Sequence, residues 1–148
     1  MKRIMINADN CMGCRNCAIA CMHAHRDSDS GSFYDLDLTD PANQSRNMIL
    51  INAHDKFIPL FCRHCSKPDC VSSCMSGALV KNPITGLVDY DAGKCAACFM
   101  CVMNCPYGVI KPDDTKTKVI RCDFCAQNGG EPSCVKVCRS EAIYVKEV

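Results

Sequence analysis

Cysteine is the residue with the clearest chemistry in this chain, since 16 of its 148 residues are cysteine. They fall into four groups of four: Cys11, Cys14, Cys17 and Cys21; Cys62, Cys65, Cys70 and Cys74; Cys95, Cys98, Cys101 and Cys105; and Cys122, Cys125, Cys134 and Cys138. No apolar stretch of signal-peptide length precedes Cys11, so we expect a cytoplasmic protein. In that reducing compartment clustered cysteines bind metal rather than form disulfides.

The spacing within the groups selects the metal centre. The first and third groups have gaps of two, two and three residues, the run of bacterial ferredoxins, and Pro106 follows the third group. In that run, three thiolates on a tight loop hold one 4Fe–4S cubane. The fourth thiolate, which we expect to begin a short helix, ligates the other cluster of a pair. Sixteen cysteines therefore predict four 4Fe–4S clusters.

Zinc is the main rival metal. Structural zinc sites use separated Cys-x-x-Cys knuckles, in which a third cysteine two residues further on has no role. Such a cysteine is present in the first and third groups, as Cys17 and Cys101. The pattern favours iron–sulfur clusters, and a structural zinc module is the weaker alternative.

Composition excludes several other classes of protein. There is no Trp and there are only five Phe and four Tyr residues, so an ordinary apolar core would be thin. A net charge of +1 argues against nucleic-acid binding, and no apolar run is long enough to span a membrane. No phosphate loop, Rossmann fingerprint or nucleophile triad occurs, so we expect no substrate site and no catalytic residues.

The groups are repeats of one structural unit. Short apolar segments at residues 4–6, 87–88 and 119–120 precede three of the groups and predict brief strands, and residues 83–86 predict a turn. The result is an α+β fold with short strands and short helices around the clusters. Residues 26–56 form an acidic insertion, interpreted as a solvated loop or a partner-docking segment, with aspartates at Asp27, Asp29, Asp35, Asp37 and Asp40.

From Cys11 to about Val145 the chain resembles a known family. The resemblance is carried by Cys62-Arg63-His64-Cys65, by residues 94–101 and by Cys105-Pro106-Tyr107-Gly108. It points to the four-cluster, ferredoxin-type electron-transfer subunits of anaerobic oxidoreductase complexes. These include iron–sulfur subunits of formate dehydrogenases, dimethyl sulfoxide reductase type enzymes, formate hydrogenlyase and tungsten aldehyde oxidoreductases, and the polyferredoxin associated with CO dehydrogenase.

This resemblance implies two dicluster ferredoxin-like units nested in the sequence. The outer lobe would comprise residues 1–56 and 112–148, and the inner lobe residues 57–111. The implied ligand sets are Cys11, Cys14, Cys17 and Cys138; Cys122, Cys125, Cys134 and Cys21; Cys62, Cys65, Cys70 and Cys105; and Cys95, Cys98, Cys101 and Cys74. Spacing alone leaves sequential pairing open, because it satisfies the same ligand count.

The function implied is a relay of single electrons between a catalytic subunit and a second redox partner. The catalytic subunit would be a tungsten or molybdenum enzyme, a CO dehydrogenase or a hydrogenase, and the second partner a flavin subunit or a ferredoxin. A free, diffusible polyferredoxin is the alternative. Six cations near the cysteines are expected to offset the negative charge of the clusters: Lys56, Lys67, Lys94, Arg121, Lys136 and Arg139. Arg63 and His64 lie inside a cluster loop, where charge and hydrogen bonds raise a reduction potential.

Overall fold

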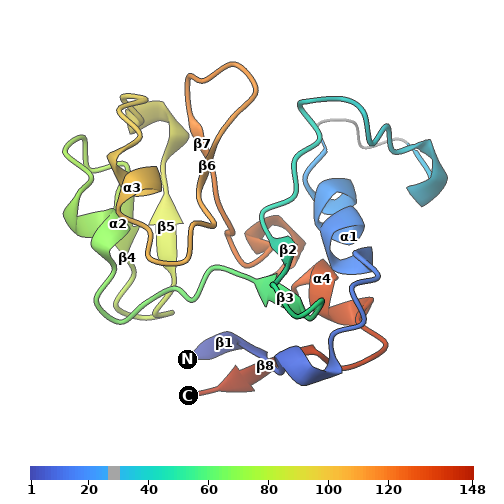
Figure 1. Ribbon diagram of the computed structural model, residues 1–148. Coiled ribbons are helices and arrows are strands. Elements are labelled where there is room, and N and C mark those ends of the chain that lie inside the picture. Colours follow the sequence, from blue (N-terminus) through green and yellow to red (C-terminus); the bar gives the residue numbers. More distant parts are fainter. Residues whose placement is uncertain (27–30) are drawn as a thin grey trace.

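The computed structural model of the protein describes residues 1–26 and 31–148 (Figure 1). Within these residues it is an α+β protein with short elements. The strands are β1 (Lys2–Ile6), β2 (Met48–Ile51), β3 (Phe57–Leu60), β4 (Leu79–Lys81), β5 (Val88–Tyr90), β6 (Lys111–Pro112), β7 (Val119–Ile120) and β8 (Ile143–Glu147). The α-helices are α1 (Asn16–Ala24), α2 (Asp69–Ser72), α3 (Met100–Met103) and α4 (Ser133–Lys136).

The described strands pair into four separate two-stranded antiparallel sheets: β1–β8, β2–β3, β4–β5 and β6–β7. The first of these joins segments from opposite ends of the chain, with Ile4 opposite Val145 and Ile6 opposite Ile143. Figure 1 shows β1 and β8 lying side by side. The cysteine groups nearest the two ends of the sequence are thereby brought into one half of the molecule.

The predicted strands before three of the cysteine groups are confirmed as β1, β5 and β7. The turn predicted at residues 83–86 joins β4 to β5. The Oδ1 atom of Asn82 accepts hydrogen bonds from the backbone N–H groups of Ile84 (2.9 Å) and Thr85 (3.1 Å), and Gly86 has a φ of +68°. Asn and Gly are the residues that tolerate such a turn at low cost.

Two small apolar cores lie among the clusters of cysteines. One contains Ile4, Phe61, Phe124 and Ile143 with Cys134, and the other Leu79, Val88, Ile110 and Val119 with Cys101. Phe61 packs in the first core and Val119 in the second, although the predicted lobe boundaries place each in the other lobe. The nested division at residues 57 and 111 stays a prediction.

The expectation that each fourth cysteine begins a helix is wrong. The helices carry the third cysteine of each group instead, as Cys70 in α2 and Cys134 in α4. The fourth cysteine follows four residues later, which is about one turn of an α-helix. Only α1 extends far enough to include the fourth cysteine as well, and in the other three groups that cysteine lies just beyond the helix.

The acidic insertion is partly a set of local turns. Asp35, Asp37 and Asp40 are exposed, and their carboxylates accept backbone N–H groups of nearby residues at 2.8–2.9 Å. Asp27 and Asp29 lie outside the described residues. None of the helices in the described part of the chain combines the length and the apolar character that a membrane crossing needs.

Candidate functional site

All four cysteine loops share one backbone feature. The residue just before the second cysteine has a positive φ: +68° at Gly13, +43° at His64, +51° at Ala97 and +60° at Phe124. Only glycine adopts this left-handed conformation freely, and other residues pay roughly 1–2 kcal/mol for it. The loops therefore hold a strained, sharply curved backbone in common, which turns their cysteines toward one centre.

One cavity is lined by four cysteines from the two ends of the chain, namely Cys11, Cys14, Cys17 and Cys138. Ile49, Pro59 and Phe61 complete its apolar wall. Burial, together with the neighbouring Cys14, Cys11 and Cys138, raises the pKa of the Cys17 thiol to about 11. The structure thus brings together the first set of cysteines that nested pairing requires.

A second cavity is lined by Cys74, Cys95, Cys98 and Cys101. The pKa of Cys101 is raised, first by burial and then by the nearby Cys74, Cys95 and Cys98. Cys74 comes from the second group and the other three come from the third. These four again match one nested set.

The remaining eight cysteines form two further sets, recognisable from their mutual electrostatic effects. Burial, together with the nearby Cys62, Cys105 and Cys65, raises the pKa of Cys70 to about 11. Burial likewise raises the pKa of Cys134, and the nearby Cys122, Cys21 and Cys125 also raise this pKa. These neighbours are the cysteines that nested pairing would join, and the ligand sets themselves stay a prediction.

The four groupings follow one another in space. Cys17 also contributes to the raised pKa of Cys134, and Cys62 and Cys21 to that of Cys122. Cys101 is buried in the second core, and Cys70, Cys74 and Cys105 pack against that core. Of the sixteen thiols only Cys14 and Cys98 are exposed, and each belongs to a grouping at one end of this row.

The donor set fits iron–sulfur clusters. Buried thiols that repel one another as thiolates need a strong positive centre to stay deprotonated, and a metal supplies it. Two of the four sets line cavities whose described lining residues include no histidine or carboxylate beside the four cysteines. Each set contains four thiols, which is the complement of one 4Fe–4S cubane.

Polar residues at the end of the insertion support two of these cysteines, and sequence reasoning missed them. The backbone N–H of Arg46 points to Cys21 Sγ at 3.2 Å, and the Asn47 side chain donates to the Cys17 carbonyl at 3.2 Å. Ser45 and Asn47 are buried, with 6% and 3% of their surface exposed. The contacts of Arg46 and Asn47 span 25 and 30 residues of sequence, so no local sequence pattern predicts them.

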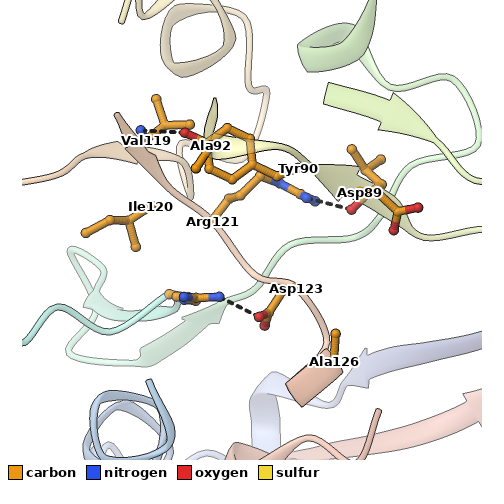
Figure 2. Close-up of a pocket in the computed structure, with 10 residues that line it drawn as sticks. Asp89, Tyr90, Ala92, Val119, Ile120, Arg121, Asp123 and Ala126 are labelled. Carbon is orange, nitrogen blue, oxygen red and sulfur yellow. Dashed lines mark hydrogen bonds and ion pairs between the residues drawn. The ribbon is translucent and has the colours of Figure 1, made fainter. Parts of the chain in front are cut away.

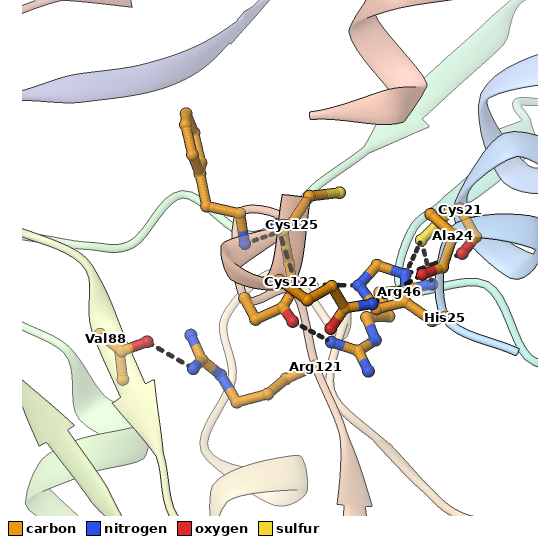
Figure 3. Close-up of polar contacts among 11 residues, drawn as sticks. Cys21, Ala24, His25, Arg46, Val88, Arg121, Cys122 and Cys125 are labelled. Carbon is orange, nitrogen blue, oxygen red and sulfur yellow. Dashed lines mark hydrogen bonds and ion pairs between the residues drawn. The ribbon is translucent and has the colours of Figure 1, made fainter. Parts of the chain in front are cut away.

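A charged network lies beside Cys122 (Figure 3). The Nε2–H group of His25 donates to the Asp123 carboxylate at 3.0 Å, and Arg46 pairs with the same carboxylate at 2.7 Å. Although burial opposes the charged form, the hydrogen bond to Asp123 raises the pKa of His25 to about 10. Arg46, Arg121 and Asp123 also line a cleft near β5 and β7 (Figure 2).

Comparison with known proteins agrees with this geometry. Residues 53–148 match the family described as the 4Fe–4S dicluster domain. The chain therefore belongs to the 4Fe–4S dicluster family, and with its sixteen cysteines it has the ligands for four 4Fe–4S clusters. The predicted α+β, dicluster ferredoxin-like fold and the predicted cofactor are confirmed, and the zinc alternative is not supported.

Two curated relatives and one solved structure illustrate the family. The beta subunit of the NADH-dependent phenylglyoxylate dehydrogenase of Aromatoleum evansii is 34% identical, over 95% of this chain and 29% of the relative. The thiosulfate reductase electron transfer subunit PhsB of Salmonella typhi is 30% identical, over 90% of this chain and 69% of the relative. A chain of the active-site complex BamBC of benzoyl coenzyme A reductase with benzoyl-CoA is 26% identical with a TM-score of 0.52, over 99% of this chain and 79% of that one.

Both curated relatives are named as subunits, which does not favour the free polyferredoxin alternative. The chain spans less than a third of the length of the first relative and about two thirds of the second.

The cofactor assignment predicts a metal content. We expect about sixteen iron atoms and sixteen sulfide ions per chain after anaerobic purification, four of each for every cubane. Colorimetric iron and sulfide assays on the purified protein measure both. A value near eight iron atoms, or zinc as the main metal, would contradict the assignment of four clusters.

Proposed function

We propose that this chain is an iron–sulfur electron-transfer subunit, without a catalytic site of its own, which carries single electrons between two redox partners. The row of four cysteine sets is the observation that carries the proposal. Its two ends are the sets with an exposed thiol, Cys14 and Cys98, while the middle sets are more enclosed. This arrangement suits a path that crosses the molecule from one surface to another.

In this proposal the nested sets are the ligand sets. Cys11, Cys14, Cys17 and Cys138 would hold one cluster; Cys122, Cys125, Cys134 and Cys21 the next; Cys62, Cys65, Cys70 and Cys105 the third; and Cys95, Cys98, Cys101 and Cys74 the fourth. When bound, each cluster takes up and releases one electron. Nesting also supports an outer lobe at residues 1–56 and 112–148 and an inner lobe at residues 57–111.

The chain's own residues provide position and environment. The left-handed loops fix the thiols, and the apolar cores around Phe61, Phe124 and Leu79 keep water from the middle of the row. The insertion supports the thiols of one helix, since Asn47 donates to the Cys17 carbonyl and the Arg46 N–H to Cys21. Hydrogen bonds and burial of this kind set cluster potentials.

A catalytic oxidoreductase subunit is the first partner in this proposal. Tungsten, molybdenum, CO dehydrogenase and hydrogenase type enzymes all fit, with a flavin subunit or a ferredoxin on the other side. A reducing cytoplasm suits sixteen free thiols. The names of the relatives, one an electron transfer subunit and one a dehydrogenase subunit, support a place in such a complex.

The test is electron delivery within the native complex. The tagged chain is isolated anaerobically from its source, the large subunit that comes with it is identified by mass spectrometry, and the complex is given that subunit's substrate. We expect electron paramagnetic resonance signals of reduced clusters with the complex and none with the isolated chain. A chain that is purified alone, as a monomer, and is reduced by many unrelated donors at equal rates would contradict the subunit role.

A further inference from the structure

A buried arginine lies against the loop that holds Cys62 and Cys65. Only 3% of the Arg121 surface is exposed. One of its terminal nitrogens donates to the Val88 carbonyl at 2.6 Å (Figure 3). The other lies 3.7 Å from Cys62 Sγ. The guanidinium charge is therefore held next to a cluster ligand, away from solvent, where screening is weak.

Two further cations meet the same loop from other directions. The Lys81 ammonium donates to the carbonyls of His64 and Cys65, both at 2.7 Å. The Arg3 guanidinium donates to the carbonyl of Arg63 at 3.3 Å and to that of His64. Three positive charges from three strands or loops thus converge on one four-residue segment.

Three cations near other cysteine loops, in contrast, are paired with carboxylates. Beside Cys122 the positive charge of Arg46 is paired with Asp123 at 2.7 Å, and Lys94, next to Cys95, lies 3.4 Å from Asp91. Lys136, near Cys134, pairs with Glu131 at 2.5 Å. Among the described residues, no carboxylate forms an ion pair with Arg3, Lys81 or Arg121. The loop of Cys62 and Cys65 therefore carries an excess of uncompensated positive charge.

Two buried N–H groups at this place also lack a hydrogen-bond partner among the residues that the structure describes. They are Arg121 Nε and His64 Nε2. His64 accepts the Val88 N–H at Nδ1 (3.0 Å), so the proton of its neutral ring is on Nε2. The ring packs edge-on against Phe124 of the next cysteine loop, with centroids 6.1 Å apart. Buried donors seldom stay unpaired, and cluster sulfur is an acceptor of the kind that would satisfy them.

We propose that Arg121, assisted by Lys81 and Arg3, makes the cluster held by Cys62, Cys65, Cys70 and Cys105 the most easily reduced of the four. This inference rests on the proposed function, because it presupposes the nested ligand sets. Reduction adds one negative charge, and a nearby buried cation stabilises the reduced form more than the oxidised form. Arg121 is a positioning residue in this scheme, since it sets the energy of the site without itself carrying electrons.

If this cluster is the most easily reduced, an electron is most stable on a cluster in the interior of the row. The grouping of Cys62 adjoins that of Cys122 on one side and the grouping of Cys101 on the other. An electron held there is remote from both exposed thiols, Cys14 and Cys98.

The test is a redox titration of the anaerobically purified protein, followed by electron paramagnetic resonance, with Arg121→Gln against Arg121→Lys. We expect the glutamine variant to keep four clusters but to lower the reduced-to-oxidised ratio of the first-reduced cluster about tenfold at fixed potential, or 59 mV for a one-electron couple. The lysine variant retains the charge and should restore most of the ratio. Lys94→Gln removes a surface cation, 65% of whose side chain is exposed, so that solvent screens its charge. It is the matched control and should leave the potential of the first-reduced cluster unchanged.

Lys81→Gln gives a second measurement if Arg121→Gln fails to fold, because Lys81 is only half-buried. It should lower the same potential. The signal that moves must be the one that Cys65→Ser alters. If four clusters are present but neither variant shifts the first-reduced signal, this inference is wrong while the proposed function stands. If fewer than four clusters are present in the unmodified protein, the proposed function itself fails.

Discussion

Replacing Cys21 with serine should disturb a cluster whose other ligands lie about a hundred residues further along the chain. Nested ligation assigns Cys21 to Cys122, Cys125 and Cys134, and a serine oxygen is a weaker ligand for iron than a thiolate. We expect one of the four electron paramagnetic resonance signals to be lost or shifted. The same signal should respond to Cys125→Ser and not to Cys65→Ser.

Two variants make this result specific. Ala18→Ser places a serine on the same helix α1 without removing a thiol, and should leave all four signals intact. Cys74→Ser is the counterpart in the inner half, and should alter the signal that also responds to Cys95→Ser. If Cys21→Ser and Cys65→Ser altered one common signal, the pairing would be sequential and the nested proposal would be wrong.

Removal of iron should abolish the fold altogether. The four sheets of the described chain have only two strands each, and isolated two-stranded sheets are marginal in water. Both apolar cores are built around cysteine side chains, with Cys134 buried in one and Cys101 in the other. Without clusters these cores lose their centres, so metal binding and folding are one process.

Circular dichroism during thermal unfolding measures this effect. After anaerobic chelation with the thiols kept reduced, we expect no cooperative transition, and we expect one to return when iron and sulfide are restored. The control is the same protein carried through the procedure without chelator. An iron-free chain that unfolds cooperatively would show that the polypeptide alone specifies the fold.

Spacing along the sequence was enough to group the cysteines by loop, because cluster binding needs three thiols on one short loop, while their assignment to clusters stays a prediction. It also predicted the strands β1, β5 and β7, where apolar residues directly precede a cysteine group. Both are local features. The left-handed residue before each second cysteine was foreseeable only at Gly13, since Ala97, His64 and Phe124 are ordinary residues forced into that conformation by their loops.

Long-range contacts could not be predicted from the sequence. Arg121 was singled out with five other cations, but nothing local distinguishes it from Lys94 or Lys136, which pair with carboxylates at the surface. Arg3 reaches a loop 60 residues away and was not anticipated, nor was Lys81. Which cations meet a cluster loop is decided by how distant strands pack, and one sequence does not record that.

The pairing of β1 with β8 has a consequence for biosynthesis. Residues 2–6 must wait on the ribosome-bound chain until residues 143–147 have been made, because neither strand has another partner in the described structure. The proposed nested sets would follow the same order: Cys62 to Cys105 could meet their iron early, whereas Cys11 to Cys21 would stay open until Cys134 and Cys138 are synthesised. In that scheme the inner half matures first, and the early thiols are the ones that most need protection from oxygen and stray metals.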